Sequence, residues 1–183
     1  MNNSSIGPLM EARPPDSHGA RIQRAYDAVV SQRSQWRERN AYYYERDLAF
    51  CRFLVPDGLD IIELGCGAGS LLAGLNPRRG VGIDISGAMI EEAKRTHPTF
   101  EFIRADVEAA GALEGLGTFD VVLISDTIGM LEDVAGFFQK LKPLLTSRTR
   151  VIVAYYSRLW EPILQLGTRL GLRRPTPALS WLS

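Results

Sequence analysis

The stretch Ile61-Ile62-Glu63-Leu64-Gly65-Cys66-Gly67-Ala68-Gly69 decides the fold of this chain. It begins with apolar residues, reaches an acid at Glu63, and then has a glycine at every second position from Gly65 to Gly69. Glycine lets the backbone adopt left-handed conformations and approach a ligand closely. The pattern therefore predicts a buried strand that turns sharply into a helix, with a ligand-binding loop at the turn.

A second short apolar run, Gly82-Ile83-Asp84-Ile85, also ends in an acid. It predicts a neighbouring parallel strand with Asp84 at its carboxyl end. A carboxylate there can accept hydrogen bonds from ribose hydroxyls, and ligands of such sheets bind outside the carboxyl ends of the strands. The two stretches together predict a nucleoside pocket.

Strands and helices alternate along the rest of the chain. We expect strands at about 59–64, 80–84, 100–104, 119–124 and 151–155. Such alternation predicts an α/β fold, Rossmann-like and doubly wound, in which a mostly parallel sheet has helices on both faces.

Three regions are expected along the chain. Residues 1–19 are rich in Pro, Gly, Ser and Asn and predict a flexible tail. Residues 20–56 predict N-terminal helices, and residues 57–183 the Rossmann-like domain. One helix face in the second region is expected to carry four residues at helical spacing: Tyr44, Leu48, Cys51 and Val55.

The composition restricts the classes of protein. Of 183 residues, 45% are hydrophobic and 23% charged, as in a soluble globular domain, and the formal net charge of +0 argues against nucleic acid as a partner. No apolar stretch is long enough to span a membrane, so we expect a cytoplasmic protein. The two cysteines and two histidines are scattered, and no metal site is expected.

The segment 63–69 resembles the first motif, E/D-x-G-x-G-x-G, of class I S-adenosylmethionine-dependent methyltransferases. Residues 82–86, 104–107 and 119–126 resemble the motifs of the second, third and fourth strands of that family. The four motifs occur in the family's order and cover roughly residues 59–156. The resemblance implies methyl transfer with S-adenosylmethionine as cofactor.

The resemblance also implies residues for the methionine end of the cofactor. The backbone around Gly65, Cys66 and Gly67 would face the methionine part. Glu63 would help to organise the ammonium group, directly or through water, and Ser125 would line the same end.

For the adenosine end, the resemblance implies four residues in two loops. Asp84 would hold the ribose hydroxyls and Ile85 would pack against the adenine. Asp106 would accept a hydrogen bond from the adenine amino group, with the amide of Val107 beside it.

Simpler interpretations exist for several residues. Cys66 is better explained as a small packing residue than as a nucleophile, because no histidine lies near it in the sequence. Ser125 and Asp126 can belong to the functional site or can simply cap the following turn. Asp126 is a candidate general base only because of its position after the fourth strand. The three tyrosines 42–44 can close over the cofactor or pack in the core. The catalytic residue stays unknown.

Two other functions were weighed. A nicotinamide-dependent oxidoreductase needs the fingerprint GxGxxG, but position 70 is Ser70 and the glycine lies one step earlier, at Gly69. A cofactor-binding module or inactive fragment is the other alternative. The family's sheet has seven strands, and we expect five here, so the last two strands are missing and the domain is C-terminally truncated. An open sheet edge would favour association.

The methyl acceptor is not identified by the sequence. The expectation is a small molecule, or a glycan or lipid-linked substrate. The latter rests on a weak resemblance of residues 155–162 and 180–183 to methyltransferase domains that are fused to, or operate beside, a glycosyltransferase.

Overall fold

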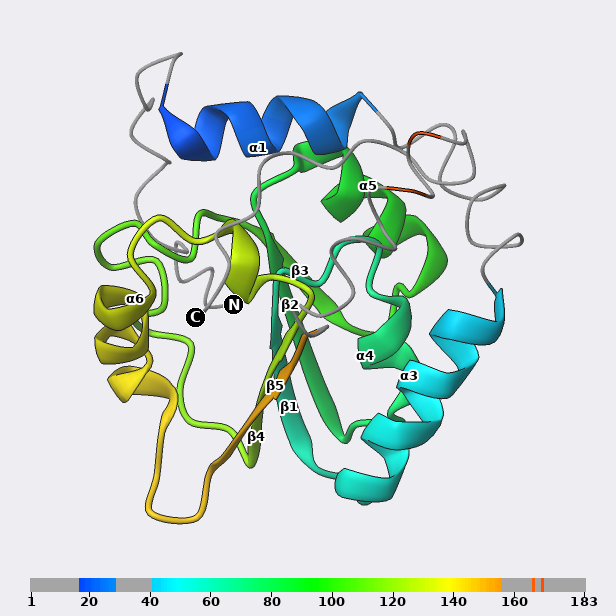
Figure 1. Ribbon diagram of the computed structural model, residues 1–183. Coiled ribbons are helices and arrows are strands. Elements are labelled where there is room, and N and C mark those ends of the chain that lie inside the picture. The colour runs from blue at the N-terminus through cyan, green and yellow to red at the C-terminus, as the bar shows by residue number, and fades with distance from the viewer. Residues whose placement is uncertain (1–16, 29–40, 156–165, 167–168, 170–183) are drawn as a thin grey trace, which may run out of the picture.

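The computed structural model describes residues 17–28, 41–155, 166 and 169. Within them a single parallel sheet has the strand order β3-β2-β1-β4-β5 (Figure 1). The strands are β1 (Asp60–Leu64), β2 (Arg79–Asp84), β3 (Glu101–Arg104), β4 (Val121–Ser125) and β5 (Arg150–Ala154). The predicted Rossmann-like α/β class is confirmed.

Helices cover both faces of this sheet. They are α1 (His18–Asp27), α3 (Ala41–Leu54), α4 (Ser70–Gly74), α5 (Gly87–Thr96) and α6 (Val134–Lys140), with 3-10 turns η1 (Ile128–Met130) and η2 (Lys142–Leu144). Figure 1 shows α3, α4 and α5 on one face and α6 on the other. Helix α1 begins inside the segment predicted as a tail, and it lies across the carboxyl ends of the strands.

The core consists of one apolar cluster on each face of the sheet. Ile61 of β1 packs with Cys51 and Leu72 on the face of α3, α4 and α5. Its neighbour Ile62 points the other way and packs with Phe137 of α6. A strand buried on both faces needs a nearly continuous apolar sequence, which explains why the central strands are so apolar.

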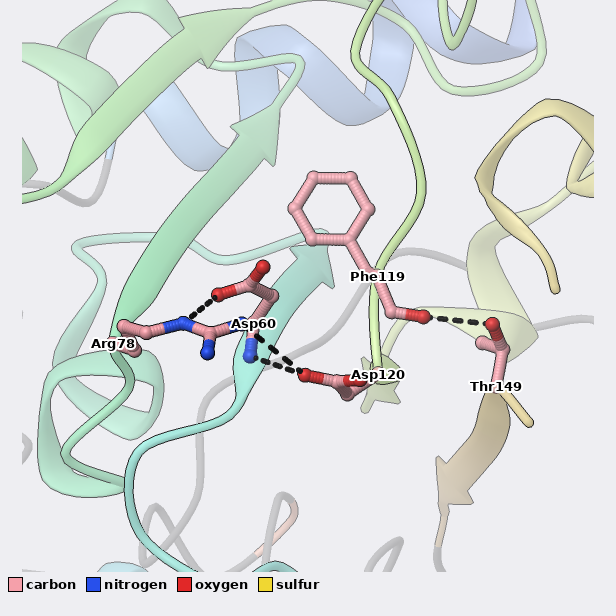
Figure 2. Close-up of polar contacts among 5 residues, drawn as sticks. All are labelled: Asp60, Arg78, Phe119, Asp120 and Thr149. Carbon is pink, nitrogen blue, oxygen red and sulfur yellow. Dashed lines mark hydrogen bonds and ion pairs between the residues drawn. The ribbon is translucent and has the colours of Figure 1, made fainter.

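Polar contacts join the strands at the amino edge of the sheet (Figure 2). The Asp60 N–H donates to Asp120 Oδ2 over 2.9 Å, and Arg78 Nε donates to Asp60 Oδ1 over 3.0 Å. Thr149 Oγ1 donates to the carbonyl oxygen of Phe119 over 2.7 Å. These contacts therefore hold the amino-terminal ends of β1, β4 and β5 together.

The direction of winding reverses at β1. From β1 the chain adds β2 and then β3 on one side, and returns to place β4 on the other side. Ligands of open α/β sheets bind at this reversal, outside the carboxyl ends of the strands. The loops after β1 and β4 flank that point. In the part of the chain that the structure describes, no helix is long and apolar enough to cross a membrane.

Candidate functional site

The loop after β1 forms a tight elbow between the strand and α4. Gly65 has φ 83°, and a Cβ atom at this position would collide with the side-chain oxygen of Thr127. The N–H groups of Gly65 and Cys66 both donate to the carbonyl oxygen of Ile83, over 2.8 and 2.9 Å. The elbow therefore requires glycine at position 65 and is attached to the end of β2.

Glu63 lies at the end of β1 and is buried, with 3% of its surface exposed. Its Oε2 atom accepts a hydrogen bond from the Leu72 N–H over 3.1 Å. Leu72 is in the first turn of α4, where backbone N–H groups have no partner within the helix. Glu63 thus orients α4, and this contact is independent of any ligand.

Asp84, at the end of β2, points toward the elbow. Its Oδ2 atom accepts from the Gly67 N–H over 2.7 Å, and its Oδ1 atom accepts from the Ser86 N–H over 2.8 Å. An ionised carboxylate only accepts hydrogen bonds, so this side chain is suited to partners that donate them. The structure brings Asp84 and the glycine loop together, as the sequence suggested.

The loop after β3 lies beside Asp84, because the Ala105 N–H donates to the Asp84 carbonyl oxygen over 3.1 Å. Asp106 in this loop is buried, and its Oδ1 atom accepts from the Glu108 N–H over 2.9 Å. Val107 is buried in the apolar cluster on the α6 face, whereas Ile85 is partly exposed. The residues predicted for the adenosine end therefore occupy adjacent loops.

Cys66 and Ser125 have different environments. Cys66 is 5% exposed and belongs to the apolar cluster on the face of α3, α4 and α5, which agrees with a packing role. Ser125 ends β4, and its side chain hydrogen-bonds the carboxylate of Asp47 on α3. Burial raises the pKa of Asp47, and the bond with Ser125 opposes this effect.

Helix α3 contributes a contact that the sequence did not predict. Tyr43 Oη donates to Asp126 Oδ2 over 3.0 Å. Burial first, and the charge of Asp126 second, raise the pKa of the Tyr43 phenol above its usual value. Of the three tyrosines, Tyr42 is 76% exposed and Tyr44 packs edge-on against the Tyr43 ring. Tyr43 and Asp47 lie four residues apart in the sequence, so a helix places both side chains on one face. This spacing was the sequence signal available for the contribution of α3 to the site.

Helix α1 connects two loops at the carboxyl ends of the strands, the side of the sheet called the carboxyl edge below. At its start, His18 Nε2 donates to the carbonyl oxygen of Met130, over 2.8 Å, in the loop after β4. At its end, Asp27 accepts a hydrogen bond from the hydroxyl of Ser86, the N-cap residue of α5 in the loop after β2. Figure 1 shows α1 across this edge. No pattern in the sequence indicates such a partner for His18.

Other features do not point to a site. A cavity of about 240 Å³ is lined by residues of the segments 109–114 and 139–143, and none of the predicted site residues borders it. A group of three or more His, Cys, Asp or Glu side chains that could hold a metal is absent from the described residues.

Comparisons with known proteins agree with this geometry. Residues 62–151 match a family model described as a methyltransferase domain. The ubiquinone biosynthesis O-methyltransferase of Rhodopseudomonas palustris (strain TIE-1) is 31% identical over 112 residues, which are 57% of this chain and 43% of that protein. The trans-aconitate 2-methyltransferase of Escherichia coli (strain 55989 / EAEC) is 32% identical over 106 residues, 56% of this chain and 41% of that protein. The chain spans less than half the length of these relatives.

Solved structures share the fold. A SAM-dependent methyltransferase from Thermotoga maritima, described as a possible histamine N-methyltransferase, has a TM-score of 0.71 at 17% identity and covers 88% of this chain and 74% of its own. The DhpI–SAH complex has a TM-score of 0.63 at 21% identity, with 75% of this chain and 69% of that chain covered.

Proposed function

Because the chain belongs to the class I S-adenosylmethionine-dependent methyltransferase family, we propose that it transfers the methyl group of S-adenosylmethionine to an acceptor. The observation that carries the proposal is the contact between the Asp84 carboxylate and the Gly67 N–H. It joins the glycine elbow to the end of the neighbouring strand at the reversal of the sheet, where a nucleoside would bind.

The adenosine half of the cofactor suits the Asp84 end of the site. The Asp84 carboxylate accepts hydrogen bonds at the end of β2, and an acceptor in this position suits the two neighbouring hydroxyls of a ribose. Adenine would lie between Ile85 and the loop that holds Asp106 and Val107. That loop is adjacent to Asp84 through the Ala105 N–H.

The methionine half suits the elbow. The cofactor carries an ammonium and a sulfonium group, so carboxylates and carbonyls are better partners for it than lysines or arginines. Glu63 supplies a buried carboxylate, and Gly65, Cys66, Gly67 and Ser125 would surround the methionine chain. When bound, the cofactor supplies an electrophilic methyl group. The residues of this chain would orient the cofactor, and α1 would limit the access of water.

A small molecule is the proposed acceptor. The named relatives act on ubiquinone precursors and on trans-aconitate by their names, but the chain spans less than half of each. A glycan or lipid-linked acceptor, or association with a glycosyltransferase, rests on residues 155–162 and 180–183. Apart from Tyr155 these lie outside the described residues, and none of the relatives supports that idea. We also propose a cytoplasmic location from the composition.

Cofactor binding without turnover is a second candidate. It is the alternative that the sequence analysis left open. Turnover of S-adenosylmethionine in the presence of an acceptor distinguishes the two, because a silent binder would bind the cofactor and release no S-adenosylhomocysteine.

The first test is calorimetry with S-adenosylhomocysteine and NADH in parallel. We expect heat with the former and none with the latter. The variant Asp84→Asn should bind more weakly, whereas Asp57→Asn, an exposed aspartate that accepts a hydrogen bond from Asn76, should bind normally. Binding of NADH alone, or of neither compound, would contradict the proposal.

A further inference from the structure

The contact between Tyr43 and Asp126 joins two segments that are 83 residues apart in the sequence. Asp126 follows β4 and has φ 53°, a left-handed conformation that residues with a side chain adopt only at a cost. Its N–H donates to the Ala154 carbonyl oxygen over 2.9 Å, and its carboxylate accepts from Tyr43. Backbone and side chain together hold Asp126 in one orientation.

Asp126 lies at the elbow end of the site. The next residue, Thr127, packs so closely against Gly65 that no Cβ atom fits between them. Because β1 and β4 are paired neighbours, the loops that follow them meet at the carboxyl edge. In the proposed function, the elbow is where the methionine end of the cofactor lies, so Asp126 belongs to the reacting end rather than the adenosine end.

The surroundings of Asp126 are acidic. Asp47, one turn after Tyr43 on α3, hydrogen-bonds Ser125, and Glu63 is buried at the end of β1. An acceptor that carries negative charge would be repelled by these carboxylates, whereas a neutral or cationic acceptor would not. The charge distribution thus favours an acceptor without negative charge. When the reacting group of such an acceptor is a hydroxyl or an amine, it loses a proton on methylation.

We propose that Asp126 is the proton acceptor for methyl transfer to a hydroxyl or amine without negative charge, and that Tyr43 is the residue that positions it. This inference rests on the proposed function. The acceptor oxygen or nitrogen forms a bond to the methyl carbon while the carbon–sulfur bond breaks. The electron pair of the broken carbon–sulfur bond remains on sulfur. The proton of the acceptor passes to Asp126, so a cationic sulfonium and a carboxylate become a thioether and a carboxylic acid.

The position of Asp126 can be tested without turnover. Sinefungin carries an amine cation where S-adenosylmethionine carries its methyl group, and S-adenosylhomocysteine carries no charge there. We expect Asp126→Asn to lower the preference for sinefungin over S-adenosylhomocysteine several-fold, and Tyr43→Phe to lower it less. Tyr42→Phe and Asp57→Asn are matched controls at exposed positions and should keep the preference.

The two proposals fail differently in this experiment. If S-adenosylhomocysteine binds and the preference is unchanged in Asp126→Asn, this inference is overturned alone. If the unchanged protein binds neither compound, the proposed function is overturned and the inference with it. A titration of tyrosinate absorbance adds a second readout: because burial raises the pKa of Tyr43 more than Asp126 does, Asp126→Asn should lower the pH at which this phenol ionises without restoring its ordinary value.

Turnover tests the acceptor class with catechol, histamine and trans-aconitate as probes. We expect methylation of catechol or histamine, and a loss in kcat of about 10²–10⁴-fold in Asp126→Asn with S-adenosylhomocysteine affinity retained. Because Tyr43 holds Asp126 and does not itself take the proton, Tyr43→Phe should lower kcat less than Asp126→Asn does and should leave the KM for S-adenosylmethionine similar. Methylation of trans-aconitate, or an unchanged kcat in Asp126→Asn, would overturn the inference.

Discussion

The Oδ2 atom of Asp84 accepts a hydrogen bond from the Gly67 N–H over 2.7 Å, so the end of β2 holds the loop that follows β1. The other carboxylate oxygen accepts from the Ser86 N–H in its own loop. One side chain therefore sets the separation of the two loops that would enclose an adenosyl group.

Replacement of Asp84 should weaken cofactor binding. In Asp84→Asn, the new amide group must turn an N–H toward one of two backbone donors, and ribose hydroxyls lose an acceptor. We expect S-adenosylhomocysteine to bind about 1–3 kcal/mol more weakly, the usual cost of an unsatisfied hydrogen-bonding group. Calorimetry measures the change, with Asp57→Asn as control. An unchanged dissociation constant would show that Asp84 does not contact the cofactor.

Loss of the His18 anchor should loosen α1 over the carboxyl edge. In His18→Ala the hydrogen bond to the Met130 carbonyl oxygen disappears, a contact worth about 1 kcal/mol. We expect faster amide hydrogen exchange in residues 18–27 and faster release of S-adenosylhomocysteine, with a similar melting temperature. Arg21→Ala changes an exposed residue of the same helix and serves as control. Equal release rates for both variants would mean that α1 does not cover the ligand.

Two substitutions of Glu63 should separate its structural and ligand roles. Glu63→Ala leaves the Leu72 N–H without its acceptor, so the free energy of unfolding should fall by about 1–3 kcal/mol. Glu63→Gln keeps an acceptor oxygen and removes the charge. Its free energy of unfolding should therefore be close to that of the wild-type protein, whereas its affinity for S-adenosylhomocysteine should be lower. Urea unfolding and calorimetry measure the two effects. If both variants unfold alike, the contact with α4 contributes little to stability.

The thiol of Cys51 should be unreactive and should make the fold sensitive to alkali. Burial, together with the charges of Asp47 and Glu63, raises the pKa of Cys51 to about 12. In the unfolded chain this thiol ionises near its usual value of about 8.5, so the folded state loses stability as the pH rises from there toward 12. Cys51→Ala should lose less stability over that range.

Thiol labelling of the native protein at neutral pH should modify neither Cys51 nor Cys66, since both are buried. Rapid labelling of either cysteine would contradict this expectation.

Local patterns were sufficient to predict most of the sheet. Each of the expected strands is present within one or two residues. The apolar runs of β1, β2 and β4 are buried on both faces of the sheet, as their composition predicts, whereas β3 and β5 are largely exposed or half-buried. The start of β4 was placed two residues early, at Phe119. This residue is buried beneath the Arg79 guanidinium, which lies 4.5 Å from the ring centroid, and it precedes the strand. Apolar sequence predicts burial better than it predicts strand pairing.

Long-range contacts could not be predicted in the same way. His18 was assigned to the tail, although its partner Met130 is 112 residues away. A contact of this kind depends on where a whole helix packs, which the spacing of a few apolar residues does not specify.

The sequence alone determined the architecture and the loops at the ends of β1 and β2, because the glycines of the elbow and the acids at the strand ends act within a few residues of the turns that they form. Only the tertiary structure decided the contacts around Asp126 and α1. Tyr43 and Asp126 meet because α3 packs on the sheet beside the end of β4, and α1 joins two loops because the sheet brings those loops to one edge. Such contacts depend on packing between elements that are distant in the chain, so no local sequence pattern predicts them.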